Sequence, residues 1–469
     1  MKEFKALIVI VCMLLVSCRL MNEERTQHKN PNIIFILTDD QRWDALGYSG
    51  NNTIHTPEMD RLANEGVYFK NAFVTTPICA ASRASIFTGM YERTHGYTFQ
   101  QGNLKQAYAS ISYPALMQNS GYYTGFFGKF GVKYEGVDSL FDVFDDYDRN
   151  GRFQDYRGFF YKTIGQDTVH LTRYTGWQAI NFIENAPSDR PFCLSLSFSA
   201  PHPHDPAPEQ YFWQLEVDSI HHSFTFGPPV MAAAAWHDAQ PEYVRNGLNR
   251  TRWYWRFDTP EKYQHSLKGY YRMISGIDLE IGRIRQVLEK KGLAGNTVII
   301  LMGDNGCFLG ERQLAGKWLM YEPSLRVPLI IYDPRNGNSH DSNDLALNID
   351  IPSTIFELAG LPIPKEWQGI SLAGYTEGGS PAKNRDIFLC EHLWDFESIP
   401  PSEGVRTQKW KYFRYLKDMA HEELYDLETD PDERNNLADA GEFGEVLKDL
   451  RSKTDSLALH FKNRKLVKQ

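Results

Sequence analysis

The sequence predicts an α/β fold, with a mostly parallel central sheet that carries helices on both faces and a small C-terminal α+β subdomain with an antiparallel sheet. Five short segments are almost uniformly apolar, which is typical of strands buried on both faces of a sheet. They are residues 31–38, 122–127, 192–199, 297–302 and 327–332. Helical patterns lie between several of these segments, and this alternation predicts helices on both faces of a parallel sheet.

Three helices are predicted between the strands. The first spans residues 56–66 and opens with a Thr-Pro pair, and the first turn of a helix tolerates proline well. A short helix over residues 80–87 follows Cys79 and stops at Thr88-Gly89. The longest covers residues 267–288, where apolar side chains recur every three or four residues.

The C-terminal part of the chain has a different pattern. Residues 405–415 and 423–427 have the composition of short strands, and residues 443–457 have the spacing of an amphipathic helix. We therefore expect a large domain over residues 30–370, followed by a subdomain over residues 371–469 that is built from an antiparallel sheet and a closing helix.

Composition limits the classes of function. The chain has 469 residues, 42% of them hydrophobic, and a formal net charge of −9. This is sufficient for a large core. The acidic balance argues against a nucleic-acid-binding protein, and an anionic ligand would need a locally basic pocket. The six cysteines are scattered without CxxC spacing, so neither a disulfide framework nor a zinc site built on them is expected.

Residues 1–18 have the pattern of a signal peptide, because a short basic start precedes an apolar run that is too short to span a bilayer. Residues 15–18 (LVSC) are similar to a bacterial lipobox, which predicts cleavage before Cys18 and attachment of lipid to it. The alternative is an ordinary signal peptidase site. We expect an exported protein, in the periplasm or at the cell surface, that touches the membrane only through a lipid anchor on Cys18.

Chemically capable side chains follow several predicted strands at their carboxyl ends, where open α/β sheets bind ligands. They are Asp39, Asp40, Lys129, His202, Asp304 and Asn305. The three aspartates and the asparagine offer only oxygen ligands, which suit Ca²⁺ or Mg²⁺ better than zinc. Each aspartate could instead cap a turn after its strand. Two adjacent buried carboxylates would repel each other without a cation, however, so Asp39 and Asp40 favour a metal site.

Cys79 lies just before a short helix, and a side chain at a helix N-terminus lies among unpaired N–H groups that favour an anion. Arg83, one turn later, can turn back toward the same place and hold an oxyanion with a forked pair of hydrogen bonds. A lone cysteine is more commonly a small buried side chain. The run CAASR from Cys79 to Arg83, followed by Thr88-Gly89, nevertheless resembles the signature of the type I (formylglycine-dependent) sulfatases of the alkaline phosphatase superfamily.

The resemblance covers most of the chain and implies a bacterial exported carbohydrate sulfatase with an alkaline-phosphatase-like fold, whose catalytic domain is the large one. In that family the cysteine that matches Cys79 is oxidised to formylglycine after synthesis. Residues that match Asp39, Asp40, Asp304 and Asn305 bind one divalent cation, usually calcium, together with the formylglycine.

The resemblance also implies a mechanism. One hydroxyl of the hydrated formylglycine at position 79 attacks sulfur, while Arg83, Lys129 and Lys317 hold the oxyanions. His202 protonates the leaving alkoxide, and the second hydroxyl then loses its proton and expels sulfate, which regenerates the aldehyde. Without the resemblance, the two lysines could be surface residues and the histidine a core residue.

Two features depart from the family pattern. Many relatives have a histidine shortly after the lysine that matches Lys129, whereas this chain has none there. His95 and His204 are candidate replacements, but neither is assigned a catalytic role. Position 81 is Ala where many relatives have Pro, which implies a formylglycine-generating maturase of the anaerobic type rather than the oxygen-dependent enzyme.

Two alternatives stay open at this point. A phosphomonoester or phosphonate hydrolase would share the fold and the metal site, but such enzymes usually carry Thr or Ser as the nucleophile. A glycan-binding lipoprotein that has lost the chemistry is the non-enzymatic alternative. We expect a sulfated carbohydrate as substrate, and the aromatic residues of the segment 138–264 could either stack on sugars or pack the insertions. Candidate sugar contacts are Asp205, Arg152, His392 and Arg406.

Overall fold

The computed structural model describes residues 30–99, 102–150, 157–205, 207, 209–379, 384–396 and 398–466. The predicted signal peptide over residues 1–18, with the lipid attachment site at Cys18, lies outside these residues. Within the described part of the chain, no helix combines the length and the apolar character needed to cross a membrane.

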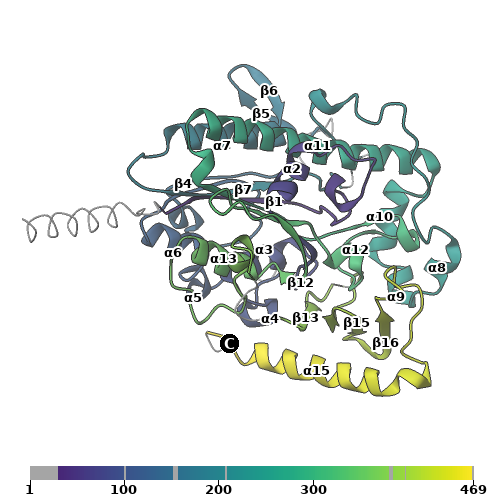
Figure 1. The fold of residues 1–469 in the computed structure, drawn as a ribbon. Helices are drawn as coiled ribbons and strands as arrows, with labels where there is room; N and C mark the ends of the chain where they lie inside the picture. Colours follow the sequence, from purple (N-terminus) through teal and green to yellow (C-terminus); the bar gives the residue numbers. More distant parts are fainter. Residues whose placement is uncertain are drawn as a thin grey trace, which may run out of the picture.

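An eight-stranded sheet runs through the middle of the molecule in the order β12-β2-β11-β8-β1-β7-β3-β4 (Figure 1). β11 is antiparallel to both of its neighbours, and all other neighbouring pairs in this sheet are parallel. The predicted mostly parallel sheet is therefore confirmed. Its strands are β1 (Asn32–Thr38), β2 (Val67–Phe73), β3 (Tyr123–Gly128), β4 (Val143–Asp146), β7 (Phe192–Phe198), β8 (Thr297–Gly303), β11 (Leu329–Tyr332) and β12 (His340–Leu347).

The central strand β1 is buried on both faces of the sheet, which is why its sequence is an uninterrupted apolar run. It pairs with β7 on one side and with β8 on the other, and all of its residues are buried. Ile33, Phe35 and Leu37 belong to one core cluster, whereas Ile34 and Ile36 belong to the other. Successive side chains thus fill two separate cores on the two faces of the sheet.

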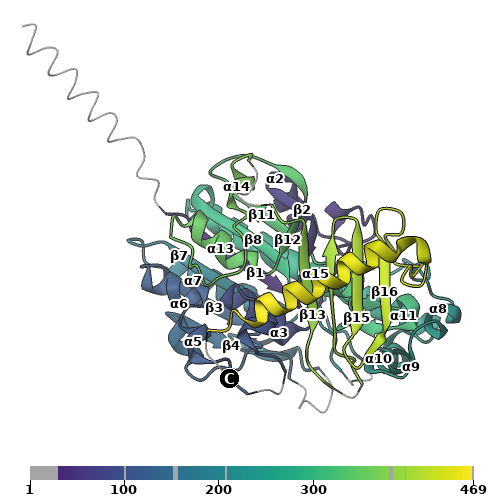
Figure 2. The ribbon, with the colours of Figure 1, turned by 90° about the horizontal axis from the view of Figure 1, so that it is seen from below.

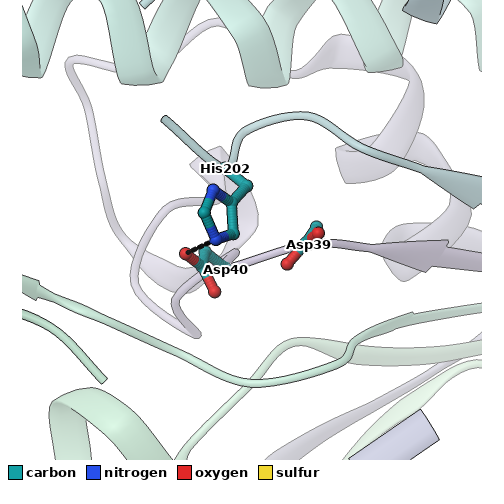
Figure 3. A group of neighbouring side chains, drawn as sticks. All are labelled: Asp39, Asp40 and His202. Carbon is teal, nitrogen blue, oxygen red and sulfur yellow. Dashed lines mark ion pairs between the residues drawn. The ribbon is translucent and has the colours of Figure 1, made fainter. Parts of the chain in front are cut away.

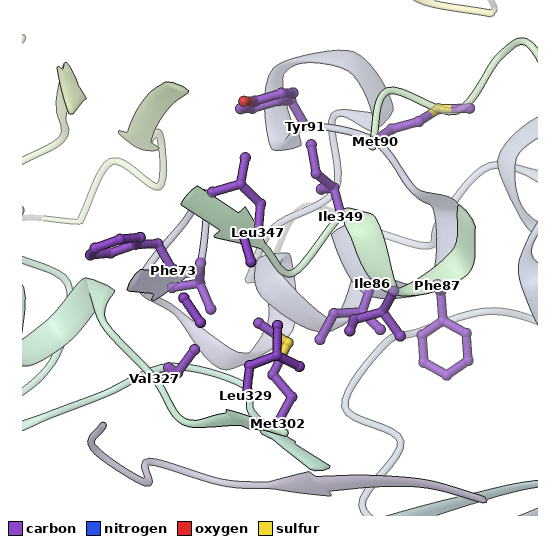
Figure 4. Packing of buried hydrophobic residues seen from close by; sticks show 14 of the residues in the cluster. Phe73, Ile86, Phe87, Met90, Tyr91, Met302, Val327, Leu329, Leu347 and Ile349 are labelled. Atoms are coloured by element: carbon purple, nitrogen blue, oxygen red, sulfur yellow. The ribbon is translucent and has the colours of Figure 1, made fainter. Parts of the chain in front are cut away.

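Helices cover both faces of the sheet, as predicted: α7 and α11 lie on one face and α3, α6 and α13 on the other (Figure 1). Ile86 and Phe87 of α3 pack in the same cluster as Met302 of β8 and Leu347 of β12 (Figure 4). The main helices are α2 (Pro57–Glu65), α3 (Cys79–Thr88), α6 (Tyr113–Asn119), α7 (Leu171–Asn185), α11 (Pro260–Lys290) and α13 (Asp350–Leu358).

The three predicted helices are all present as α2, α3 and α11, but α11 is longer than predicted. It begins at Pro260 instead of residue 267, and the Thr259 side chain accepts a hydrogen bond from the backbone N–H of Lys262 at 3.3 Å. The added N-terminal turns are mostly polar, so apolar spacing could not reveal them. The cap and the N1 proline are the signals that could have done so.

The C-terminal part forms a four-stranded antiparallel sheet, in the order β13-β14-β15-β16, with α15 lying across it (Figure 2). The predicted antiparallel subdomain with a closing helix is confirmed, whereas the boundary at residue 370 stays a prediction. The single strand predicted over residues 405–415 is wrong, because the chain turns after Thr407 and its hydroxyl accepts a hydrogen bond from the Trp410 N–H at 2.8 Å. The elements are β13 (Ile387–His392), β14 (Ser402–Thr407), β15 (Trp410–Tyr415), β16 (Asp418–Asp426) and α15 (Gly444–Lys462).

Short elements connect these layers and carry several residues of the site. They are α4 (Glu92–His95), α5 (Gln106–Ala109), β5 (Phe160–Ile164), β6 (Asp167–His170), α8 (Ala234–Asp238), α9 (Glu242–Arg245), α10 (Leu248–Arg256), β9 (Phe308–Leu309), β10 (Ala315–Gly316), α12 (Glu322–Leu325) and α14 (Ala373–Thr376).

A buried ion cluster joins the C-terminal sheet to the large domain. The ammonium of Lys411 on β15 lies 2.7 Å from Oε1 of Glu322 on α12 and 2.6 Å from Oε1 of Glu433. All three side chains are buried. Little water reaches either carboxylate there, so both rely on compensating charge from Lys411, and Glu322 has a second partner in Arg406 at 3.4 Å.

We predict that Lys411→Ala destabilises the protein by about 3–5 kcal/mol, because it removes the cation that two buried carboxylates share and leaves Glu322 with Arg406 alone. The measurement is the free energy of unfolding from denaturant titration. Lys409→Ala is the control, since that lysine also pairs with acids, Asp426 and Glu428, but on the surface. Equal effects of the two substitutions would contradict a structural role for the buried cluster.

Candidate active site

Four adjacent strands, β8-β1-β7-β3, bring the candidate residues to one end of the sheet. Asp39 and Asp40 follow β1, Asp304 and Asn305 follow β8, and Lys129 follows β3. His202 comes from the loop after β7. All six side chains are buried. The structure therefore brings together the polar residues that were predicted to follow the strands, because neighbouring parallel strands end at the same edge of the sheet.

The two adjacent carboxylates are held by two lysines. Nζ of Lys129 donates to Oδ2 of Asp39, and Nζ of Lys317 donates to Oδ1 of Asp40 at 2.5 Å. Burial by itself raises the pKa of Asp39, but the cations of Lys129, Lys317 and Arg83 outweigh it and hold that pKa well below its usual range. Asp39 is therefore an anion in the folded protein.

Asp304 and Asn305 complete an oxygen-rich wall beside this pair. The Asn305 amide donates to Oδ1 of Asp40 at 2.6 Å, and Oδ1 of Asp304 accepts from the Asp40 N–H at 3.1 Å. Burial, together with the charge of Asp39, raises the pKa of Asp304 to about 6. Oδ1 of Asp39 and Oδ1 of Asn305 are buried and find no hydrogen-bond partner among the described residues.

These residues fit a divalent cation. Buried oxygens without donors are costly unless a cation or water satisfies them, and carboxylate and amide oxygens are the ligands that Ca²⁺ and Mg²⁺ prefer. Asp39, Asp40 and His202 are also close enough to hold one ion together (Figure 3). The sequence assigned the metal to oxygen ligands only, so His202 is an addition to the group that could surround it.

His202 lies beside Asp40 in a defined orientation. Its Nδ1 is 2.7 Å from the Pro203 carbonyl, which can only accept, so the neutral ring carries its proton on Nδ1. Nε2 then faces the site, 3.6 Å from Oδ2 of Asp40 (Figure 3). Burial and the cations of Arg149, Lys317 and Lys129 lower the pKa of His202 well below its usual value.

Cys79 and Arg83 reach this cluster from α3. Cys79 is its first residue, and Ile78 before it is the N-cap. Burial lowers the pKa of Lys317, but negative charge on Asp40, on the Cys79 sulfur and on Asp39 outweighs it and raises that pKa above its usual range, so the Cys79 side chain lies near the lysine. Nε of Arg83 donates to Oδ2 of Asp304 at 2.8 Å.

Arg83 faces the cluster with a nitrogen that makes no hydrogen bond. Its Nη1 donates to the Lys129 carbonyl, while Nη2 is buried without a hydrogen-bond partner in the described part of the chain and lies 3.7 Å from Oδ2 of Asp39. Gly131 makes room for this side chain, since a Cβ on it would lie 2.8 Å from Cδ of Arg83. The position shortly after Lys129, where many relatives carry a histidine, is thus occupied by a backbone that the arginine packs against.

Arg149 and Asp148 belong to the cluster, although no pattern in the sequence pointed to them. Nη2 of Arg149 is 3.4 Å from Nε2 of His202, and Oδ2 of Asp148 is 3.6 Å from Nζ of Lys129. Both residues follow β4, a four-residue strand at the edge of the sheet that is only partly buried. Such a strand lacks an apolar run, so it could not be located from the sequence.

Other candidates lie elsewhere or serve the packing. His95 bonds Ser85 and the N–H of Tyr97, and burial lowers its pKa to about 3. His204 Nε2 is 3.4 Å from the Asn150 carbonyl. Neither takes the place of the missing histidine. Among the candidate sugar contacts, Arg406 pairs with Glu322 and His392 is buried at the end of β13, whereas Arg152 lies outside the described residues and Asp205 pairs with Arg252 and Arg256.

The aromatic segment 138–264 is used mainly for packing where it is described. Phe159 is buried and stacks on His170 with ring centroids 5.0 Å apart. Trp213 and Trp253 lie under the guanidinium groups of Arg272 and Arg250 at 4.6 and 4.0 Å. These contacts favour the packing interpretation for these side chains.

Comparisons with known proteins agree with this arrangement. Residues 31–361 match the family described as Sulfatase, and residues 310–460 match the one described as N-sulphoglucosamine sulphohydrolase, C-terminal. The chain is 28% identical to the N-acetylglucosamine-6-O-sulfatase of Bacteroides thetaiotaomicron, and the match covers 97% of this chain and 91% of that protein.

Solved structures share the fold as well. One that was determined in complex with its substrate D-glucosamine-2-N,6-O-disulfate has a TM-score of 0.76 at 28% identity, and the match covers 93% of this chain and 99% of that one. The phosphonate monoester hydrolase of Silicibacter pomeroyi also has a TM-score of 0.76, over 92% of this chain and 95% of that one. At 20% identity, this second likeness concerns the fold alone.

We predict that Ca²⁺ raises the midpoint of thermal unfolding of the wild type and not of Asp40→Asn. A ligand that binds only the folded state stabilises it by about 2.7 kcal/mol at a hundredfold excess over Kd, and the substitution removes one of the adjacent carboxylates. Glu357→Gln, which changes an exposed acid, is the control and keeps the full shift. A Ca²⁺ shift that survives in Asp40→Asn would place the ion elsewhere.

Proposed function

Because the chain belongs to the sulfatase family, whose members are sulfuric ester hydrolases, we propose that it removes O-sulfate from a glycan or oligosaccharide. The catalytic groups are a formylglycine derived from Cys79 and one divalent cation, for which Ca²⁺ is the best fit. The observation that carries this proposal is the meeting of Cys79, three cationic side chains and a wall of oxygen ligands at one edge of the sheet.

The cation would be held by Asp39, Asp40, Asp304 and Asn305 together with the side chain at position 79. Bound there, the ion and the hydrated aldehyde would supply a polarised hydroxyl as the nucleophile. Their oxygen atoms suit a hard cation as ligands. Oδ1 of Asp39 and Oδ1 of Asn305 have no hydrogen-bond partner among the described residues, and a bound cation would offset the free-energy cost of burying them.

Arg83, Lys129 and Lys317 would bind the sulfuryl oxygens. Each is buried and cationic, and their positive charge faces the place where negative charge increases as the ester bond breaks. The overall reaction consumes one water, breaks the bond between sulfur and the ester oxygen, and yields sulfate and a free hydroxyl on the sugar. Burial of the three cations strengthens their hold, because little water screens them.

His202 would deliver the proton to the leaving oxygen. Its neutral ring carries the proton on Nδ1, and Nε2 faces the site beside Asp40. The surrounding cations disfavour a second proton while no anion is bound. A bound sulfate ester brings negative charge next to Nε2, and this charge offsets the cations and favours the protonated imidazole that the acid step needs.

A glycan substrate is supported by aromatic side chains near the site. Trp394 packs in one cluster with Ile78, the neighbour of Cys79, and its ring stacks on Phe396 with centroids 4.8 Å apart. Phe99 adds a third ring, 5.5 Å from Trp394. Partly exposed rings of this kind can stack on the apolar face of a sugar. Relatives that act on glucosamine sulfates also support a glycan as the substrate.

The proposals on export and maturation are supported by the sequence alone. The leader over residues 1–18 would direct the protein to the periplasm or the cell surface with lipid on Cys18, and Ala81 would direct Cys79 to an anaerobic maturase. The competing phosphonate hydrolase has only a fold-level likeness to support it. The inactive glycan-binding lipoprotein would have no reason to retain the buried cations around Cys79.

We predict that the wild type, produced in a host that matures the cysteine, releases sulfate from at least one member of a panel of sulfated saccharides. Cys79→Ala abolishes release, because no other side chain supplies the aldehyde. Cys390→Ala, which changes another buried cysteine, retains it. Ion chromatography of sulfate is the measurement, with mass spectrometry of the peptide that contains position 79. Activity that persists in Cys79→Ala would refute this mechanism.

We predict that His202→Ala lowers kcat on a sugar sulfate by about 10²–10⁴-fold, the usual contribution of a general acid. An aryl sulfate with an acidic phenol as leaving group needs no such proton, so its kcat falls far less. His265→Ala, which changes a partly exposed histidine, is the control. Equal losses on both substrates would assign His202 a role other than protonation of the leaving group.

A further inference from the structure

The helix α10 (Leu248–Arg256) is fixed to the turn that carries Lys317. The Asn249 amide donates to the carbonyls of Ala315 and Lys317, each at 2.9 Å. These bonds place the next turn of α10, and with it Arg252, beside the catalytic cluster. The sequence did not single out Arg252, because nothing in the local pattern of α10 indicates what it packs against.

Arg252 lies over the residue that follows Lys317. Its guanidinium carbon is 4.5 Å from the centre of the Trp318 ring, which orients the group by a cation–π contact. Gly316, with a φ of 87°, leaves the room for this approach, since a Cβ there would lie 3.1 Å from Nη1 of Arg252. The chain thus holds the arginine in one position at the edge of the site.

The charge around Arg252 is not balanced. Its Nη2 is 2.7 Å from Oδ2 of Asp205, but the same carboxylate also pairs with Arg256. Nε and Nη1 of Arg252 are buried and have no hydrogen-bond partner among the residues that the structure describes. Burial and the charge of Arg149 together lower the pKa of Arg252 to about 10, although Asp40 acts in the opposite direction.

Arg256, on the same helix, differs from Arg252 in its hydrogen-bond partners. It is almost fully buried, and its Nε donates to the side chain of Gln210 at 2.5 Å. Among the described residues, the ion-pair partner of Arg252 is this shared carboxylate. Asp148, another acid of the cluster, is paired with Arg149 and with Lys129. Within the described part of the chain, two donors of Arg252 are therefore left to bind an anion.

We propose that Arg252 binds a second anionic group of the substrate, beside the sulfate that is cleaved. The group is a second sulfate on the same sugar or the carboxylate of a neighbouring uronate, both of which match the donors of a guanidinium. The inference rests on the proposed function and narrows it, since it selects multiply anionic glycans over sugars that carry a single sulfate.

The test compares binding of matched saccharides by calorimetry to the full chain with Ca²⁺, in a Cys79→Ala background where no turnover occurs. One pair is glucosamine-6-O-sulfate and glucosamine-2-N,6-O-disulfate. The other is a monosulfated sugar without and with a linked uronate. We expect the second anion to lower the dissociation constant by about tenfold or more in one of the two pairs. That pair shows whether Arg252 binds a sulfate or a carboxylate.

Arg252→Gln removes this preference, whereas Arg252→Lys keeps part of it, because the charge remains and the fork is lost. Arg250→Gln is the matched control on the same helix, since Arg250 bonds Gln313 and stacks on Trp253 and Tyr254. It keeps the full preference. The unfolding midpoint of each variant is measured in parallel to exclude a loss of fold.

The proposal is wrong if neither second anion tightens binding, or if Arg252→Gln leaves the ratio of the two dissociation constants at the value of its parent. Sulfate release by the matured wild type is measured separately. Failure of release with an intact, Arg252-dependent preference would contradict the proposed catalysis and still support the anion site. Release of sulfate without a preference for the second anion would support the proposed catalysis and contradict the anion site at Arg252.

Discussion

The buried pair of carboxylates at Asp39 and Asp40 is the constraint on which the rest of the site depends. Two adjacent anions removed from water require positive charge from elsewhere in the chain. Lys129 comes from the end of β3, Lys317 from the turn after β10, and both donate to the pair. The strand order β8-β1-β7-β3 puts the ends of β1 and β3 at the same edge of the sheet, whereas Lys317 follows the separate two-stranded sheet of β9 and β10. Oxygens that still lack a partner mark the space for a cation.

The acidic chain, of net charge −9, gathers several buried cationic side chains around the site, which is what an anionic substrate requires. Its cations differ in what holds them. Arg83 is fixed by Asp304, whereas Arg252 shares Asp205 with Arg256 and keeps two donors unused. Glycine positions make this crowding possible, because Gly131 and Gly316 leave the space that the two arginine side chains fill. Substrate recognition would thus use the same charge surplus as catalysis.

The sequence was sufficient for the parts of the fold that are buried on both faces. β1, β3, β7 and β8 are near-uniform apolar runs, and the residues that follow them meet because parallel strands end at one edge. β2 and β12 were missed, since each exposes polar side chains on the way, such as Lys70 in β2. Arg149 and Arg252 could not be found for a different reason. Their place depends on how an edge strand and a short helix pack, and no local pattern encodes that contact.

The measurement that tests the central claim most directly is a crystal structure of the matured protein grown with Ca²⁺. The account predicts density for one ion in contact with Asp39, Asp40, Asp304, Asn305 and a formylglycine at position 79. Lys129 and Lys317 should then face the open side of the ion, where the sulfate would bind. An ion bound elsewhere, or lysines that still occupy both carboxylates with no ion between them, would contradict it.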